Sequence, residues 1–318
     1  MSHTLRLIGV RLLQLPIMIL GITFLVFFVM SFSPVDPARN ALGETASAEA
    51  LADYRAANGL DLPLLARYAA FLLGLVQGDL GTYSARRLPV IDEVVRAFPV
   101  TLSLTFLGLL IAVVIAFVLG ILAAVYRDRW PDQAIRILGV AALSTPSFWL
   151  AILLIQAFTL ALGVLPASGP LPPFGQNPGG WLARMTLPAI ALAVPVIGQL
   201  SRVVRTSMVE ELDRDYVRTA LGAGIPRVVV VGRNVLRNAL ITPVTVLGLR
   251  IGYLLGGAVV IEIIFAIPGM GTLILNGVTN NEPNLVQGVT LAVALAFVII
   301  NIIVDLLYVL INPRIRAV

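Results

Sequence analysis

Six runs of about 20 apolar residues set the limits on how this chain can fold. They occupy residues 12–32, 100–126, 137–163, 186–205, 241–265 and 287–311. A helix of about 20 apolar residues is long enough to cross the hydrocarbon core of a bilayer. Of the 318 residues, 58% are hydrophobic and 12% are charged, too little charge to cover a soluble globular surface. The chain is therefore predicted to be an all-α, multi-pass membrane protein with six transmembrane helices.

Arginine placement predicts the orientation of these helices. Arginines gather in the N-terminal tail (1–11), between the second and third runs, in the connection 206–240 and in the C-terminal tail (312–318). Cytoplasmic loops carry an excess of basic residues, and these four regions alternate correctly for one side of a six-span protein. Both termini are therefore expected in the cytoplasm. The run 12–32 is expected to be a retained anchor, because it exceeds the apolar part of a signal peptide and no cleavage pattern comes after it.

The segment 33–99 is the one sizeable stretch expected outside the membrane, on the extracytoplasmic side. Residues 64–78 are apolar but short, which favours an interfacial or re-entrant helix over a seventh span. A seventh span would also reverse the orientation of every later span. The polar part, 36–61, is either a contact surface for a partner protein or a disordered surface loop. The remaining residues, 100–311, are expected to form the transmembrane core.

Three absences limit the chemistry of this chain. It has no cysteine and no lysine, and its one histidine, His3, lies in the N-terminal tail. Disulfides, thiolate nucleophiles and cysteine or histidine metal clusters are therefore excluded, and no metal site is expected. A phosphate-binding loop of the G-x-x-x-x-G-K-[ST] type needs a lysine. If ATP drives this protein, another chain must hydrolyse it. The high pI of about 10.1 reflects arginines beside apolar runs and does not indicate nucleic-acid binding.

The stretch "DYVRTALGAGIPRVVVVGRNVLRNAL", 215–240, is too structured for a plain connection. Asp213 or Asp215 is placed to cap a short helix. Val217, Ala220 and Leu221 then form an apolar stripe, with Tyr216 beside it. Gly222 and Gly224 can take positive φ and end the helix, and Pro226 suits the first turn of a second one. The pattern predicts a helix, a glycine bend and a second helix. It favours a docking knob for a partner protein over a basic loop that only sets topology.

This segment resembles the cytoplasmic loop of ABC-importer permeases of the dipeptide, oligopeptide and nickel transport family. "DYVRTA", Gly224 and "LRNAL" match the form of the loop found in peptide permeases. Against the general E-A-A motif the match is partial, because Arg218 and Thr219 stand in its first two positions and Arg237 replaces a proline. Further segments resemble the family in order along the chain: "GDLGTYS" (78–84), "FPVTLSL" (98–104), "STPSFWLAILL" (144–154), "EIIFAIPGMG" (262–271), "VQGVTL" (286–291) and "NIIVDLLYVLINPRIR" (301–316).

The resemblance implies a type I ABC importer permease fold in a bacterial inner membrane. Such a permease pairs with a second, homologous permease, two ATPase subunits that bind ATP and Mg, and an extracytoplasmic substrate-binding protein. No cofactor is expected in this chain. The residues expected to couple to an ATPase are Asp215, Tyr216, Val217, Arg218, Thr219, Ala220, Leu221, Gly222, Gly224, Arg237 and Asn238. The expected substrates are di- or oligopeptides, with glutathione, a nickel chelate, an opine or an oligosaccharide as alternatives.

Three charged residues fall inside predicted spans: Arg250, Glu262 and Asp305. A charge in the hydrocarbon core needs water or a partner. Arg250 and Asp305 lie at similar depths, so we expect them to pair or to share a water-filled cavity, as a packing ion pair or as part of the pathway. Glu262 precedes a helix break expected at Pro268 and Gly269, and is either a gate residue or a carboxylate that snorkels to the membrane surface.

Other polar residues and prolines complete the candidate sites. Asn276, Asn280, Asn281 and Glu282 are candidates for contact with the binding protein. Pro146 and Pro195 are expected to kink the third and fourth spans. A stand-alone secondary transporter or channel, and a membrane scaffold without transport, are the alternatives in other functional classes. A secondary transporter would favour inverted repeats or a titratable relay, and neither is clear in the sequence.

Overall fold

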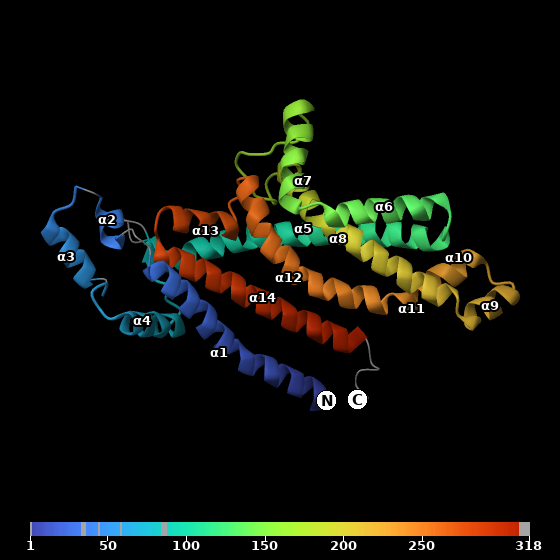
Figure 1. Ribbon diagram of the computed structural model, residues 1–318, viewed down its shortest axis with the longest axis horizontal. Coiled ribbons are helices and arrows are strands. Elements are labelled where there is room, and N and C mark those ends of the chain that lie inside the picture. The colour runs from blue at the N-terminus through green and yellow to red at the C-terminus, as the bar shows by residue number, and fades with distance from the viewer. Residues whose placement is uncertain (1, 33–35, 44, 58, 84–87, 312–318) are drawn as a thin grey trace. The chain divides into compact units, whose positions relative to one another are not determined.

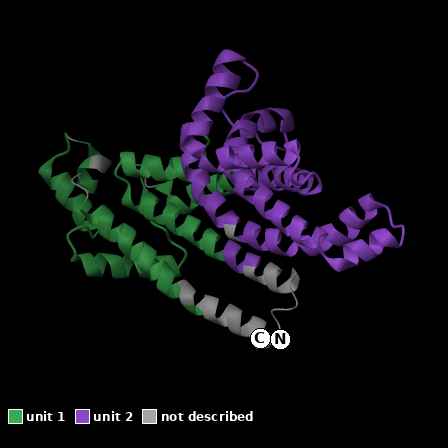
Figure 2. Ribbon diagram, turned by 45° about the vertical axis from the view of Figure 1, so that its right-hand side comes forward, with its two compact units in different colours: residues 1–101, 267–299 green, residues 102–266, 300–318 purple. Residues whose placement is uncertain are grey.

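The computed structural model describes residues 2–32, 36–43, 45–57, 59–83 and 88–311 (Figure 1). It divides into two compact units, each made of two stretches of chain (Figure 2). Unit 1 contains residues 1–101 and 267–299, and unit 2 contains residues 102–266 and 300–318. The described chain is mostly helical, which agrees with the predicted all-α class.

Unit 1 combines long apolar helices with a set of short polar elements. Its helices are α1 (Ser2–Ser31), α2 (Pro37–Leu42), α3 (Ala48–Ala57), α4 (Leu64–Val76), α13 (Met270–Thr279) and the first part of α14 (Pro283–Ile311). Strands β1 (Thr82–Tyr83) and β2 (Leu88–Pro89) form an antiparallel pair, and the long helix α5 (Val90–Val125) begins directly after β2. Its core joins Leu80, Val90 and Val94 to Met270, Leu285 and Val289.

The polar part of the 33–99 segment folds into helices, so of the two alternatives for 36–61 the disordered loop is wrong for its described residues. Asp36 caps α2 by accepting a hydrogen bond from the backbone N–H of Ala38 at 3.0 Å. The same carboxylate pairs with Arg55 on α3. These two contacts hold α2 and α3 together although few apolar side chains are buried there.

Helix α4 occupies the region predicted to form a short apolar helix. Its Tyr68 hydroxyl lies 2.9 Å from the Thr23 hydroxyl and donates to the Leu20 carbonyl at 2.9 Å. Tyr68 also makes ring contacts with Phe24 and Phe27 of α1. Tyr68 therefore fixes α4 against α1 by both polar and aromatic contacts.

Unit 2 is built around one long helix, α8 (Pro178–Leu212), which packs against several others. The elements around it are α6 (Trp130–Ser144), α7 (Ser147–Leu154), the π-helix η1 (Ile155–Ala161) and α12 (Ile241–Ile264). Glycines permit the closest approaches. A Cβ on Gly198 would lie 2.5 Å from the Gly139 carbonyl oxygen, and one on Gly120 would lie 2.6 Å from Val204 Cβ. Small residues at these crossings allow the helix backbones to approach closely.

Four described helices are long and apolar enough to cross a membrane: α5, α8, α12 and α14. A fifth crossing results if α6 and the α7–η1 helix count as one bent span. The apolar part of α1, Pro16–Ser31, is shorter than these. The chain is thus a multi-pass membrane protein.

The kink predicted at Pro146 is present, and it divides the predicted third span, 137–163, into two helices. The chain bends by 101° between α6 and the helix that begins at Ser147, so α7 rises away from α6 (Figure 1). Proline has no N–H to donate and disfavours helical backbone in the residue before it. Thr145 accordingly has ψ 116 and Pro146 ψ 135, both extended. At Pro195, in contrast, α8 continues as one helix.

Candidate functional site

The segment 206–240 folds as two helical pieces around a turn. Helix α9 (Asp215–Gly222) begins after a two-residue break at the end of α8. A second helical stretch, formed by α10 (Arg227–Val229), the π-helix η2 (Val230–Val235) and α11 (Leu236–Ala239), then leads into α12. The predicted helix, bend and helix are therefore present. The wide π turn was not foreseen, because no residue type in "VVGRNV" distinguishes it from an α-helix.

The capping prediction for α9 is wrong. Arg214 occupies the N-cap position and makes no side-chain capping bond. Asp213 instead ends α8, and its carboxylate accepts a hydrogen bond from Arg127 Nη1 at 2.8 Å. Asp215 is already the first residue of α9. The carboxylate of Asp213 is engaged by an arginine from another connection, which local sequence cannot reveal.

The turn after α9 is closed by a Schellman arrangement centred on Gly224. The N–H of Ile225 donates to the Ala220 carbonyl at 3.1 Å, and that of Gly224 donates to the Leu221 carbonyl at 3.0 Å. Gly224 has φ +80, which is favourable only for a residue without Cβ. Gly222 lies inside α9 and does not take positive φ, so of the two predicted bend glycines only Gly224 has that role.

Two of the three stripe residues of α9 face inward, which corrects the expectation that the whole stripe is displayed. Val217 is only 4% exposed and joins a cluster with Met208 of α8 and Val230 and Val235 of η2. Ala220 packs against the same cluster, whereas Leu221 remains 42% exposed. Val217 and Ala220 anchor α9 to its own chain. An amphipathic pattern shows that a helix has an apolar face but does not say what covers it.

Tyr216 and Asn238 link the two helical pieces. The Tyr216 hydroxyl donates to Glu211 Oε2 at 2.9 Å, and Asn238 Nδ2 donates to the Tyr216 oxygen at 3.3 Å. Burial raises the pKa of the Tyr216 phenol above its usual value, so the group stays protonated and able to donate near neutral pH. Two residues predicted to act in coupling are therefore part of one hydrogen-bonded network that joins the end of α8, α9 and α11.

An exposed apolar tip remains beyond this anchored base. It consists of Leu221, Ile225, Val228 and Val229, which are 42%, 38%, 84% and 43% exposed. Val228 also lines a groove of about 440 Å³ with Val125, Tyr126, Arg129 and Val231. Of the tip, the sequence prediction included only Leu221. The run "IPRVVV" directly after a glycine turn is the signal that could have identified the rest.

A buried arginine organises the other end of unit 2. Arg184 of α8 is 2% exposed and donates to the carbonyls of Ala167 at 2.6 Å and Gly169 at 2.9 Å. Its Nη2 also donates to the Phe265 carbonyl at 3.0 Å and the Ala266 carbonyl at 3.3 Å. Arg184 thus ties the irregular connection before α8 to the end of α12. Arg184 is not among the candidate residues identified from the sequence.

The charged residues predicted within the spans have different environments. The Arg250 guanidinium lies 5.8 Å from the centre of the Tyr253 ring, a cation–π geometry. The predicted pairing of Arg250 with Asp305 stays a prediction, because the side chain of Asp305 lies outside the described residues. Glu262 is fully buried within α12, which contradicts a carboxylate that snorkels to the membrane surface. Its role at a gate stays a prediction.

The helix break at Pro268 and Gly269 is present. Helix α12 ends at Ile264 and α13 begins at Met270, after Ala266 with φ +49. In unit 1 the N–H of Met270 donates to Thr101 Oγ1 at 2.9 Å, which fixes the start of α13 on α5. The segment after the break is helical again, so only a few residues around Pro268 are irregular.

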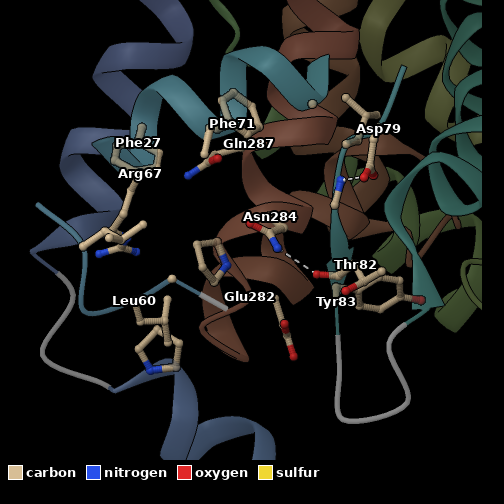
Figure 3. A pocket seen from close by; sticks show the side chains of 18 of the residues that line it. Phe27, Leu60, Arg67, Phe71, Asp79, Thr82, Tyr83, Glu282, Asn284 and Gln287 are labelled. Atoms are coloured by element: carbon tan, nitrogen blue, oxygen red, sulfur yellow. Dashed lines mark hydrogen bonds between the residues drawn. The ribbon is translucent and has the colours of Figure 1, made fainter. Parts of the chain in front are cut away.

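The residues suggested for contact with a binding protein all lie in unit 1. Asn276 is in α13, whereas Asn280 and Asn281 come after that helix, and Asn281 has φ +49. Asn281 and Glu282 line a cavity of about 270 Å³ that also includes Pro37, Tyr54 and Leu60 of the polar segment 36–61 (Figure 3). The structure therefore brings parts of the two candidate surfaces to one cavity.

A multi-pass helical membrane protein with an anchored, apolar-tipped segment between two spans has the features of a transport permease. The chain belongs to the binding-protein-dependent transport system inner membrane component family, whose model matches residues 116–317. The N-terminal model of the same family matches residues 4–105. The resemblance drawn from the motifs is confirmed. The chain is thus the membrane permease subunit of a binding-protein-dependent transport system, not a catalytic enzyme.

Several named relatives are similar to this chain over nearly their whole length. The chain is 38% identical over 302 residues to a putative peptide transport system permease protein of Brucella abortus (strain 2308), covering 95% of this chain and 96% of the relative. It is 38% identical over 321 residues to the probable D,D-dipeptide transport system permease protein DdpB of Escherichia coli (strain K12), covering 95% and 94%. It is 39% identical over 306 residues to the glutathione transport system permease protein GsiC of Escherichia coli O6:H1, covering 96% and 97%.

Proposed function

We propose that this chain forms half of the translocation pathway of an ATP-driven importer for di- or oligopeptides. Relatives of similar identity are named for peptide, D,D-dipeptide and glutathione transport, which supports a peptide-like substrate with glutathione as the second candidate. The other half of the pathway is a second, homologous permease. An extracytoplasmic binding protein delivers the substrate in a bacterial inner membrane.

The proposed topology has six spans with both termini in the cytoplasm. Helix α1 is the first span, and α6 with the α7–η1 helix is the third, bent span. The arginines of 206–240 then lie on the cytoplasmic side, and the 33–99 segment lies outside. In this orientation Asn281, Glu282 and the cavity beside α2 and α3 face the binding protein.

The single observation that carries the proposal is the division of the 215–240 segment into an anchored base and an exposed apolar tip. Val217 and the Tyr216 network hold α9 to its own chain, while Leu221, Ile225 and Val228 point away from the cluster. A small apolar tip of this kind fits a groove on a partner protein. We place it in a groove of an ATPase subunit, with Asp215, Arg218 and Thr219 on the flank.

The base explains how a partner could move the pathway. Helix α9 lies directly after α8 in the chain, and α10, η2 and α11 lead into α12. A displacement of the tip therefore acts on two long helices of unit 2 at once. ATP and Mg are bound by the two ATPase partners in this proposal, because the chain has no lysine and so no phosphate-binding loop.

The test is a set of three Val→Asp variants, each expressed with the partner subunits. Val228→Asp places a charge on the 84% exposed tip and is expected to abolish co-purification of the ATPase while the permease remains folded. Val164→Asp changes a 61% exposed valine outside this segment and is the matched control. Val217→Asp, at a buried position, is expected to lower the amount of folded permease itself. Full ATPase binding and peptide uptake by Val228→Asp would overturn the proposed docking tip.

The substrate is tested on the assembled transporter with its binding protein. Uptake of a labelled dipeptide into vesicles is expected to depend on ATP and to be inhibited more strongly by unlabelled dipeptides than by glutathione. Preferential inhibition by glutathione would replace the peptide assignment with the second candidate. Uptake that needs no ATPase subunit would instead favour a secondary transporter.

A further inference from the structure

A groove between α6 and α8 in unit 2 has the shape and charge of a site for a membrane phospholipid. It has a volume of about 400 Å³ and is lined by one stripe of each helix. The stripe of α6 runs through Arg136, Gly139, Val140 and Leu143, and residues spaced in this way lie on one helix face. The wall formed by Val140 and Leu143 is 60% and 42% exposed, an apolar surface open to the lipid.

The stripe of α8 supplies the other side of the groove, at matching helical spacing. It runs through Gly198, Ser201, Arg202, Arg205 and Thr206. The helices nearly touch at Gly139 and Gly198, because a Cβ on Gly198 would lie 2.5 Å from the Gly139 carbonyl oxygen. Toward the start of α6 the Arg205–Asp132 ion pair bridges them, with Nε to Oδ1 and Nη2 to Oδ2 both at 2.6 Å. The basic part of the groove therefore lies beside two fixed contacts, and the apolar wall continues past Gly139.

The charge in this groove is positive. Three arginines line it, and the carboxylate of Asp132 forms its ion pair with Arg205. Arg136 and Arg202 are exposed, and neither takes part in an ion pair within the part of the chain that the structure describes. Two guanidinium groups that face one opening favour a phosphate, because guanidinium binds phosphate oxygens through paired N–H donors.

The depth of the groove matches the level of lipid headgroups. Trp130, the first residue of α6, is 80% exposed, and exposed tryptophans mark the membrane–water interface. Arg136 lies six residues further on, about 9 Å along the helix, where a long basic side chain can reach back to the headgroups. The apolar wall lies further along the same face. Basic pockets between membrane helices bind anionic headgroups.

We propose that this groove binds an anionic phospholipid, whose phosphate lies between Arg136 and Arg202 and whose acyl chain lies along Val140 and Leu143. The headgroup lies between the Asp132–Arg205 pair and the level of the Gly139–Gly198 contact, and the acyl chain extends beyond that contact. The lipid fills the groove between α6 and α8. Helix α8 is the helix that leads into the segment 215–240. The proposal does not depend on the substrate or on the docking partner of the tip.

The test measures lipids retained by the assembled transporter, purified in detergent with equal amounts of phosphatidylglycerol and phosphatidylcholine of the same acyl chains. Native mass spectrometry is expected to show roughly tenfold more phosphatidylglycerol than phosphatidylcholine on the unmodified complex, equivalent to one charge-assisted contact. Arg136→Gln with Arg202→Gln is expected to remove this preference. Arg233→Gln, which removes the charge of an exposed arginine outside the groove, is the matched control and is expected to retain it.

Several outcomes would overturn the proposal. One is the absence of a headgroup preference in the unmodified complex, and another is its persistence in the double variant. Leu143→Trp, which fills the apolar wall without changing charge, must also lower phosphatidylglycerol binding, so the proposal stays testable if the double variant folds poorly. If inorganic phosphate displaced the lipid as readily as the free headgroup glycerophosphoglycerol did, the groove would be a site for free anions and not for a phospholipid. Because the chain has no cysteine, Val140→Cys introduces a single thiol. If a short cross-linker joined this thiol to the second permease, the groove would be a subunit interface and the lipid proposal would be wrong.

Discussion

Arg184 Nη2 donates a hydrogen bond to the carbonyl oxygen of Phe265 at 3.0 Å, although 81 residues separate them in sequence. Phe265 comes directly after the last residue of α12, where helix carbonyls lack partners within the helix. A cation is favoured there by the helix dipole as well as by the hydrogen bond. One side chain of α8 therefore completes the end of α12 and, through Gly169 and Ala167, holds the irregular connection that precedes α8.

Replacement of Arg184 tests this clamp. Arg184→Gln leaves several buried carbonyls without a donor, and each buried polar group left unsatisfied costs about 1–3 kcal/mol. We expect a clear fall in the midpoint of thermal unfolding of the purified complex. Arg184→Lys is expected to recover only part of the loss, because an ammonium lacks the planar fork that reaches carbonyls on several sides. Arg96→Gln, at an exposed arginine of α5, serves as the control. Equal stability of Arg184→Gln and the control would show that the clamp contributes nothing.

The Asp132–Arg205 pair allows a second test, which asks what stabilises the fully buried carboxylate of Asp132. Asp132→Asn leaves Arg205 without its bidentate partner, and breaking a buried ion pair in this way typically costs about 3–5 kcal/mol. Asp132→Leu combined with Arg205→Met removes both charges and is expected to be clearly more stable than Asp132→Asn. The measurement is the yield and unfolding midpoint of each permease in the same detergent. A double variant as unstable as Asp132→Asn would mean that the ionic pair itself is required.

Gly222 and Gly224 make a matched pair because an added Cβ would meet nothing within 4 Å at either position. Only Gly224 has a positive φ, +80. Gly224→Ala is therefore expected to cost about 1–2 kcal/mol from the left-handed backbone, and to lower coupled uptake by misplacing the tip. Gly222→Ala adds a good helix former within α9 and is expected to be neutral or slightly stabilising. The measurements are peptide uptake and the midpoint of thermal unfolding for each of the two variants. Equal losses of uptake and stability in both variants would show that the positive φ of Gly224 is not the cause.

Acid is expected to loosen α2 and α3. The hydrogen-bonded pairing with Arg55 holds the pKa of Asp36 below its usual value of 3.8, and the Ala38 N–H adds to this effect. A lowered pKa in the folded state means that the stabilisation is fully present above the ordinary pKa and is lost as pH falls through the lowered one. Hydrogen exchange in 36–57 should thus reflect constant stability from pH 8 to 5, after correction for intrinsic exchange rates, and weaker protection below about pH 4. Asp36→Asn should remove the acid-dependent step. If this variant kept the same step, another group would be responsible.

The sequence predicted helix ends best where proline or glycine determines them. The fifth span was predicted at 241–265 and is observed at Ile241–Ile264, and the breaks at Gly224 and at Pro268 result from backbone constraints of single residues. The size of the bend at Pro146 could not be predicted, because a proline permits a range of angles and the packing of the helices around it selects one.

Residues whose function depends on distant contacts were assigned less well. Val217 has the spacing of a displayed stripe, but its partners Met208 and Val230 come from other elements and draw it inward. Arg184 looked like one charge beside an apolar run, and only the fold brings four carbonyls to it. For Val217 periodicity identified an important face and tertiary structure decided its orientation, whereas no sequence pattern marked Arg184.

The π-helix between Val230 and Val235 lies between the tip and α12, so its winding sets the register of one relative to the other. A π turn contains more residues than an α turn of the same rise, so conversion to α geometry would rotate the residues before the turn relative to those after it. One residue corresponds to about 100° of helical rotation. Val228 lies before this turn and α12 lies after it. A change of winding here would therefore rotate the tip about the helix axis. A displacement of the tip would then twist α12.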